Sequence, residues 1–157
     1  MTLGLLQGNI LIDSYGKPLI CDFGFSRVCH EVTRTYSDIR EGGKLRFLAP
    51  ELLEGPEKFR TSGASDIFSL SMTFLNIWAL ERPFAHFPNG LLAAAAIRNG
   101  VRPSRPMENL GIPFEGMESL WVLIQQMWTH DADSRPTAQV VKLQLEDIFA
   151  SPRCCTP

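Results

Sequence analysis

Four sets of residues stand in a fixed order along this 157-residue chain. Their side chains suit two kinds of chemistry, metal coordination and ion pairing. The sets are Asn9, Asp22-Phe23-Gly24, Ala49-Pro50-Glu51 and Arg135. Amide and carboxylate oxygens are hard donors of the kind that Mg²⁺ accepts. A guanidinium pairs with a carboxylate through two parallel hydrogen bonds. Any one tripeptide arises easily by chance, but four ordered sets at fixed offsets do not, so their spacing is more informative than any single set.

The segment between the first two sets is typical of a β-hairpin. Residues 9–13 and 18–21 are short apolar runs, and Ser14-Tyr15-Gly16-Lys17 between them has a turn-forming composition. Cys21 ends the second run and is interpreted as a small hydrophobic residue in a strand. The predicted hairpin leads directly into Asp22.

The rest of the chain predicts a mainly helical domain. Helical periodicity and boundary residues predict helices at residues 65–80, 89–98, 116–130 and 137–149. The first of these has Ser65 or Asp66 as a candidate cap. Its expected core-facing residues are Phe68, Met72, Leu75 and Ile77. The polar residues 28–44 lack periodicity and predict a long loop. The expected fold class is α+β, mainly α-helical, with a short β-hairpin before Asp22.

Composition excludes several functional classes. A hydrophobic content of 45% and a net charge of −2 favour one soluble domain without a nucleic-acid or membrane partner. Residues 70–80 are too short an apolar stretch to span a bilayer, and residues 1–13 lack a signal-peptide pattern. A cytoplasmic or nuclear location is therefore expected. The four cysteines have no metal-binding spacing, and residues 151–157 are expected to form a disordered tail.

The four sets, together with these elements, resemble the C-terminal lobe of a protein kinase. In that family the catalytic loop H-R-D-L-x-x-x-N precedes a D-F-G segment, and A-P-E ends the activation segment. Residues 43–51 resemble the family's G-T-x-R-[YW]-M-A-P-E, although Lys44 replaces the threonine. Residues 65–71 resemble S-D-V-W-S-x-G at the start of the large central helix. Local features favour the tyrosine-kinase-like serine/threonine kinases. The resemblance implies a domain at residues 1–150 with its activation segment at 22–51.

The resemblance also implies cofactors and site residues. ATP and Mg²⁺ would be the cofactors, with Asn9 and Asp22 as the metal ligands. The implied nucleotide-binding residues are Asn9, Leu11, Cys21, Asp22, Phe23 and Gly24. Glu51 and Arg135 would form a buried ion pair. Asp66 would accept hydrogen bonds from backbone N–H groups of the catalytic loop.

The position of the catalytic base holds a glycine. Counting back five positions from Asn9 gives Gly4, and the lysine position two residues later holds Leu6. Neither side chain can orient a hydroxyl nucleophile or neutralise a phosphoryl group. Loss of a positioned base alone costs about two to four orders of magnitude in rate. No catalytic residue is assigned, the N-terminal lobe is expected to be absent, and the chain is expected to be inactive.

Three interpretations stay open at this point. The chain is a kinase-like domain whose parent activity is ATP-dependent phosphoryl transfer to serine or threonine hydroxyls of a protein substrate. It is alternatively a pseudokinase-type module that binds protein partners through its helices. It is alternatively an incomplete record of an active kinase, in which residues 1–7 come from a misplaced start. An unrelated helical domain would have to match four spaced motifs by accident.

The central helix also predicts an exposed apolar patch. Its apolar residues are too many for the remaining helices to cover, and a large exposed patch favours association. The residues concerned are Phe68, Met72, Leu75, Ile77 and Trp78. We therefore expect self-association or dependence on a partner.

Overall fold

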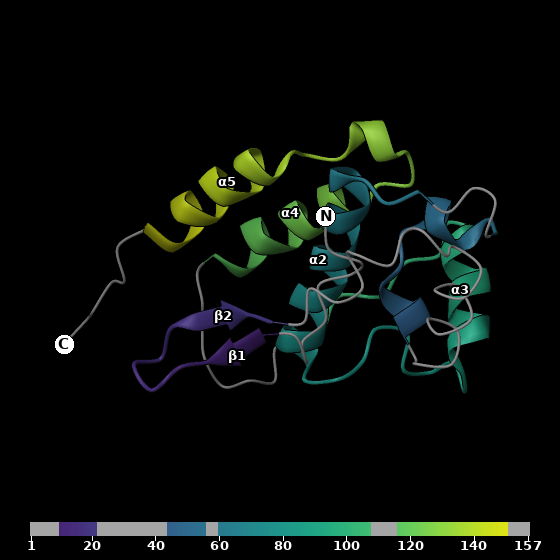
Figure 1. Ribbon diagram of the computed structural model, residues 1–157, viewed down its shortest axis with the longest axis horizontal. Coiled ribbons are helices and arrows are strands. Elements are labelled where there is room, and N and C mark those ends of the chain that lie inside the picture. The colour runs from purple at the N-terminus through teal and green to yellow at the C-terminus, as the bar shows by residue number, and fades with distance from the viewer. Residues whose placement is uncertain (1–9, 22–43, 56–59, 108–115, 151–157) are drawn as a thin grey trace.

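The computed structural model describes residues 10–21, 44–55, 60–107 and 116–150. Within these ranges the chain forms four α-helices, three 3-10 helices and one two-stranded sheet. The α-helices are α2 (Gly63–Ala79), α3 (Gly90–Arg98), α4 (Met117–Met127) and α5 (Ala138–Ala150). In Figure 1, α2 lies near the centre, with α4 and α5 on one side and α3 on the other. The predicted α+β, mainly helical fold class is confirmed.

The predicted hairpin is present. Strands β1 (Ile10–Ile12) and β2 (Pro18–Ile20) pair antiparallel. The turn between them is held by the carboxylate of Asp13, which accepts a hydrogen bond of 2.9 Å from the backbone N–H of Tyr15. Gly16 follows with a φ of 80°, a left-handed conformation that favours glycine. Turn chemistry therefore fixes the register in which the two strands meet.

Helix α2 begins earlier than the sequence predicted. Ser62 is the N-cap, and its side chain accepts a hydrogen bond of 3.1 Å from the backbone N–H of Ser65. The Ser65 hydroxyl in return accepts one of 2.9 Å from the backbone N–H of Ser62. The prediction of Ser65 or Asp66 as the cap was wrong, because this reciprocal capping box places both residues inside the first turn.

We expect Ser62→Ala to lower the free energy of unfolding by about 1 kcal/mol, because the cap oxygen is lost. Urea unfolding followed by circular dichroism measures this change. Ser104→Ala is the matched control, since Ser104 is exposed in an irregular segment. Equal midpoints for the two variants would show that the cap contributes nothing.

Two apolar clusters form the core of the described residues. The larger cluster joins α2 and α3 to the 3-10 helices η3 (Lys44–Phe47) and η4 (Pro50–Leu53). The smaller cluster joins α2 to α4 and α5, with Ile67, Leu123, Met127 and Val141 as its buried members. Helix α2 therefore contributes to both clusters and organises the lobe.

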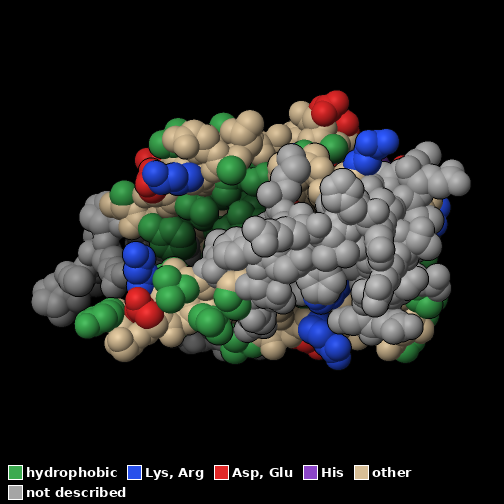
Figure 2. All heavy atoms as spheres, viewed as in Figure 1, with side chains coloured by type: hydrophobic (Ala, Val, Ile, Leu, Met, Phe, Trp, Pro, Cys, Tyr) green, Lys and Arg blue, Asp and Glu red, His purple; other side chains and the backbone are tan. Residues whose placement is uncertain are grey.

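The expectation that the central helix is poorly covered was largely wrong. Four of the five apolar residues named for it are buried, namely Phe68, Met72, Leu75 and Trp78. Ile77 is 46% exposed, so the prediction that it faces the core was wrong; η3, η4 and α3 cover other faces of the helix. Figure 2 nevertheless shows hydrophobic side chains gathered in a recess between α5 and the hairpin. None of the helices in the described ranges is long and apolar enough to cross a bilayer.

Candidate functional site

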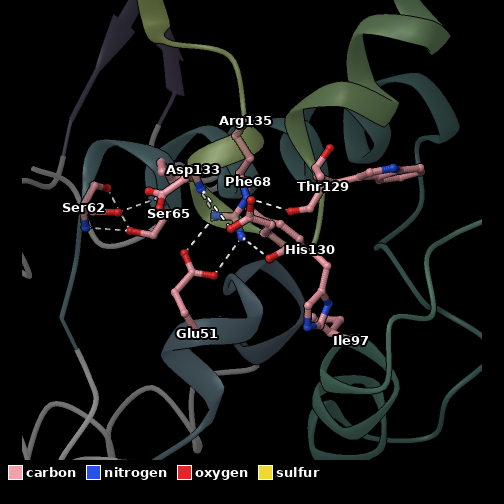
Figure 3. A network of polar contacts seen from close by, with 12 residues as sticks. Glu51, Ser62, Ser65, Phe68, Ile97, Thr129, His130, Asp133 and Arg135 are labelled. Carbon is pink, nitrogen blue, oxygen red and sulfur yellow. Dashed lines mark hydrogen bonds and ion pairs between the residues drawn. The ribbon is translucent and has the colours of Figure 1, made fainter.

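A network of polar contacts around Arg135 joins distant parts of the chain. Arg135 directly follows η6 (Ala132–Ser134), and Glu51 lies in η4. The Nη1 atom of Arg135 lies 2.8 Å from Oε1 of Glu51, and its Nη2 atom lies 2.8 Å from Oε2. Figure 3 shows the two side chains meeting end to end in this bidentate arrangement. The pairing expected from the sequence is therefore formed between residues 84 positions apart.

The remaining donors of Arg135 also find acceptors. Its guanidinium donates to the backbone carbonyls of Ala64 at 2.9 Å, Thr129 at 2.8 Å and His130 at 3.1 Å. With the two bonds to the carboxylate, all five N–H groups of the guanidinium are used. The side chain of Arg135 is fully buried, whereas that of Glu51 is 31% exposed. Arg135 therefore links η4, the start of α2 and the end of α4.

A second guanidinium, to which the sequence motifs assign no role, lies in the same region. Arg102 donates to the carbonyls of Trp128 at 2.9 Å and Ile97 at 3.2 Å, so it connects the ends of α4 and α3. Arg102 and Arg135 each place their guanidinium carbon 5.2 Å from the ring centre of Phe68. Burial lowers the pKa of Arg102, and the nearby charge of Arg135 lowers it further. An arginine followed by a proline just after a helix was the signal available in the sequence.

Arg46 is, with Arg135, one of the two buried arginines among the described residues. It lies in η3 with 5% of its surface exposed. Its guanidinium donates to the carbonyls of Pro83 at 3.3 Å and Phe87 at 2.8 Å, and it also contacts the carbonyl of Phe84. Burial lowers the pKa of Arg46, and the charge of Arg82 adds to this effect. The signal in the sequence was a charged residue inside the apolar run 45–50, which the family resemblance had left without a role.

These contacts position the segment that the resemblance equates with the end of the activation segment. Arg135 holds η4 through Glu51, and Arg46 holds η3 against residues 83–87. The hydroxyl of Ser69 adds a hydrogen bond of 2.8 Å to the carbonyl of Phe47. These contacts together hold η3 and η4 against α2 and residues 83–87.

Most of the expected nucleotide-site residues lie outside the described ranges. They are Asn9, Asp22, Phe23 and Gly24, together with Gly4 at the base position. Leu11 lies in β1 with 54% of its surface exposed, and Cys21 follows β2 as a half-buried free thiol. Among the described residues, no cluster of three or more His, Cys, Asp or Glu residues could hold a metal ion. ATP and Mg²⁺ therefore stay cofactors that the family resemblance implies, and the described residues do not test whether this chain binds them.

Asp66 lies in the first turn of α2, where its backbone N–H donates to the carbonyl of Ser62 at 3.2 Å. A carboxylate at this place is favoured by the helix dipole. Its expected partners in the catalytic loop fall outside the described residues. That Asp66 stabilises the catalytic loop therefore stays a prediction.

Comparison with known proteins finds one family over most of the chain. The protein kinase domain family matches residues 5–144. The receptor-interacting serine/threonine-protein kinase 2 of Bos taurus is 27% identical over 144 residues, which cover 90% of this chain and 27% of that protein. The dual specificity protein kinase shkA of Dictyostelium discoideum is 30% identical over 156 residues, which cover 98% of this chain and 27% of that protein.

A third relative gives the same result. The receptor-interacting serine/threonine-protein kinase 4 of Mus musculus is 29% identical over 153 residues, which cover 96% of this chain and 19% of that protein. The chain thus spans between 19% and 27% of the length of these three curated relatives. The family match begins before the hairpin and ends within α5. The chain belongs to the protein kinase superfamily, with a resemblance to its tyrosine-kinase-like members.

Proposed function

We propose that the parent activity of this domain is transfer of the γ-phosphoryl group of ATP to serine or threonine hydroxyls of a protein. The match to the protein kinase domain supports this reaction class, and two relatives are named as serine/threonine-protein kinases. In such enzymes catalysis comes mainly from positioning and from neutralising the charge of the phosphoryl group, with Mg²⁺ contributing to the second. The implied metal ligands are Asn9 and Asp22.

We propose further that the 157-residue chain itself transfers no phosphoryl group. The observation that carries this proposal is the residue pair at the base and lysine positions, Gly4 and Leu6. A glycine has no side chain to accept the proton of the attacking hydroxyl, and a leucine cannot offset negative charge. Removal of a general base costs about two to four orders of magnitude in rate.

A phosphotransfer assay tests this proposal. The chain is incubated with radiolabelled ATP, Mg²⁺ and a generic protein substrate, and the labelled protein is counted. Incorporation should equal that of a blank without the chain. Incorporation above the blank that disappears in Asp22→Ala would contradict the proposal, since Asp22 is the implied metal ligand.

A second candidate function is a protein-interaction module of the pseudokinase type. It is favoured by the packing of the lobe, because α2 buries Phe68, Met72, Leu75 and Trp78 in a shared core. A helical lobe that has such a core can present its outer surface to a partner without carrying out chemistry. The discriminating result is a protein interaction that survives Asn9→Ala combined with Asp22→Ala. An interaction that depends on both residues would instead favour a nucleotide-dependent role.

A further inference from the structure

The outer edge of β1 presents backbone groups to which nothing in the described part of the chain bonds. Antiparallel strands alternate between residue pairs that exchange hydrogen bonds and pairs whose backbone groups point away from each other. Asp13 and Lys17 close the hairpin, with 3.0 Å between the N–H nitrogen of Asp13 and the carbonyl oxygen of Lys17. Counting back from this pair, the backbone groups of Leu11 point toward β2, and those of Ile10 and Ile12 point outward.

The outer edge of β2 is less suited to accept a further strand. Its outward residues are Pro18 and Ile20, the partners of the two outward residues of β1. Because proline has no N–H, this edge has one outward donor where the edge of β1 has two. Neither strand carries a charged side chain, although charges commonly protect exposed edges. The open edge is therefore that of β1, which in Figure 1 lies on the far side of β2 from α4.

The hairpin receives little support from the core. Leu11, Ile12 and Leu19 are 54%, 64% and 45% exposed. Since neighbouring residues of a strand point to opposite faces, both faces of the sheet carry exposed apolar side chains. Neither apolar cluster of the core includes a described residue of the hairpin. A two-stranded hairpin alone is marginally stable in water, and further strands stabilise it.

We propose that β1 of a second copy of this chain pairs with this edge, so that two hairpins form one four-stranded sheet. An antiparallel two-fold pairing centred on Leu11 sets Ile10 of each copy opposite Ile12 of the other. Both residues point outward, so the two donors and two acceptors of each copy match those of the other. The remaining edges carry Pro18, which favours a closed dimer over a growing fibre. This inference does not depend on phosphoryl transfer by the chain.

Charge permits this contact, and its size makes it weak. Asp13 and Lys17 are the charged residues among positions 10–21, and both flank the turn. In an antiparallel pair the two turns lie at opposite ends, so their like charges do not meet. A standard interface uses about 20–30 residues a side and covers about 800 Å² per partner. Strands of three residues cover much less than this, so the dimer should dissociate on dilution.

A disulfide trap tests the pairing directly. In a chain whose four natural cysteines are replaced by serine, Leu11→Cys places one thiol on each side of the two-fold axis. Such partners, which exchange no hydrogen bonds, lie about 4.5 Å apart at Cα, within the range that a disulfide spans. We expect oxidation to give a covalent dimer. Leu19→Cys, a matched control of similar exposure on β2, should cross-link at least tenfold less.

Sedimentation velocity over a series of concentrations tests the contact without a cross-link. The wild-type chain should shift from monomer to dimer as its concentration is raised. Ile12→Pro removes an outward N–H and no bond within the hairpin. It should weaken self-association by roughly tenfold or more, because each dimer loses two hydrogen bonds. Leu143→Lys, which places a charge at an exposed apolar position on α5, is the control and should leave self-association unchanged.

The unfolding midpoint of each variant is measured alongside. If Ile12→Pro unfolds, the comparison of Leu11→Cys with Leu19→Cys decides alone. A monomer at every concentration, equal cross-linking of the two cysteine variants, or equal weakening by Ile12→Pro and Leu143→Lys would each overturn the proposal. Cross-linking of Leu11→Cys to an added apolar peptide with one cysteine, without a covalent dimer, would assign the edge to a different strand and would also overturn it.

Discussion

Arg135→Ala should lower the free energy of unfolding by about 3–5 kcal/mol, the range for removal of one member of a buried ion pair. Arg135 is fully buried, and its loss leaves the carboxylate of Glu51 without its partner. It also leaves the carbonyls of Ala64, Thr129 and His130 without their donor. Urea unfolding monitored by tryptophan fluorescence measures the change.

Glu51→Ala should cost less, about 3 kcal/mol. Its side chain is partly exposed, so water can reach the vacated place, and Arg135 keeps its three carbonyl acceptors. Lys142→Ala is the control, because Lys142 forms an exposed pair with Glu146 at 3.6 Å and such pairs contribute up to about 1 kcal/mol. Similar small effects for all three variants would mean that the ion pair does not stabilise the lobe.

Arg46→Ala should lower the free energy of unfolding by about 3 kcal/mol, because hydrogen bonds from a charged donor contribute about 1.5–3 kcal/mol each and part of this is regained from water. The carbonyls of Pro83, Phe84 and Phe87 would lose the guanidinium as their hydrogen-bond donor. The left-handed conformation of Phe84 would also lose its constraint. Hydrogen exchange should accordingly rise across residues 83–87.

Arg82→Ala is the matched control for Arg46→Ala. Arg82 is an exposed arginine directly before Pro83, whose carbonyl accepts from Arg46. The charge of Arg82 disfavours the charged form of Arg46. Its removal should therefore leave the unfolding midpoint unchanged or slightly raised. If Arg46→Ala also left the midpoint and the exchange of residues 83–87 unchanged, the carbonyl contacts would have no stabilising role.

Local sequence signals were sufficient for most of the helices and for the hairpin. Turn residues between two apolar runs predicted the hairpin, and periodicity predicted α2 to α5 within a few residues of their bounds. Helix α4 ends at Met127 rather than at His130, because Trp128 forms its C-cap. The pairing of Glu51 with Arg135 followed only from the family resemblance, since no local rule connects residues so far apart.

The contacts of Arg46 and Arg102 could not be predicted in the same way. Arg46 and Arg102 act through backbone carbonyls, which every residue carries, so their partners leave no mark in the sequence. The cap of α2 was missed because Gly63 and Ala64 separate Ser62 from the apolar run. The exposure of Ile77 depends on which neighbours cover α2, and that is decided by tertiary packing.

The central claim is that this chain has the lobe of a protein kinase but does not transfer a phosphoryl group. Its most direct test measures the release of ADP when the chain is incubated with ATP and Mg²⁺. This measurement needs no knowledge of the protein substrate, because water serves as the acceptor when no hydroxyl is supplied. The wild-type chain is compared with Asp22→Ala and with buffer in a coupled assay. We predict that all three rates are equal, since Gly4 offers no base at the position equated with the catalytic aspartate. ADP release by the wild-type chain above buffer, lost in Asp22→Ala, would contradict this prediction.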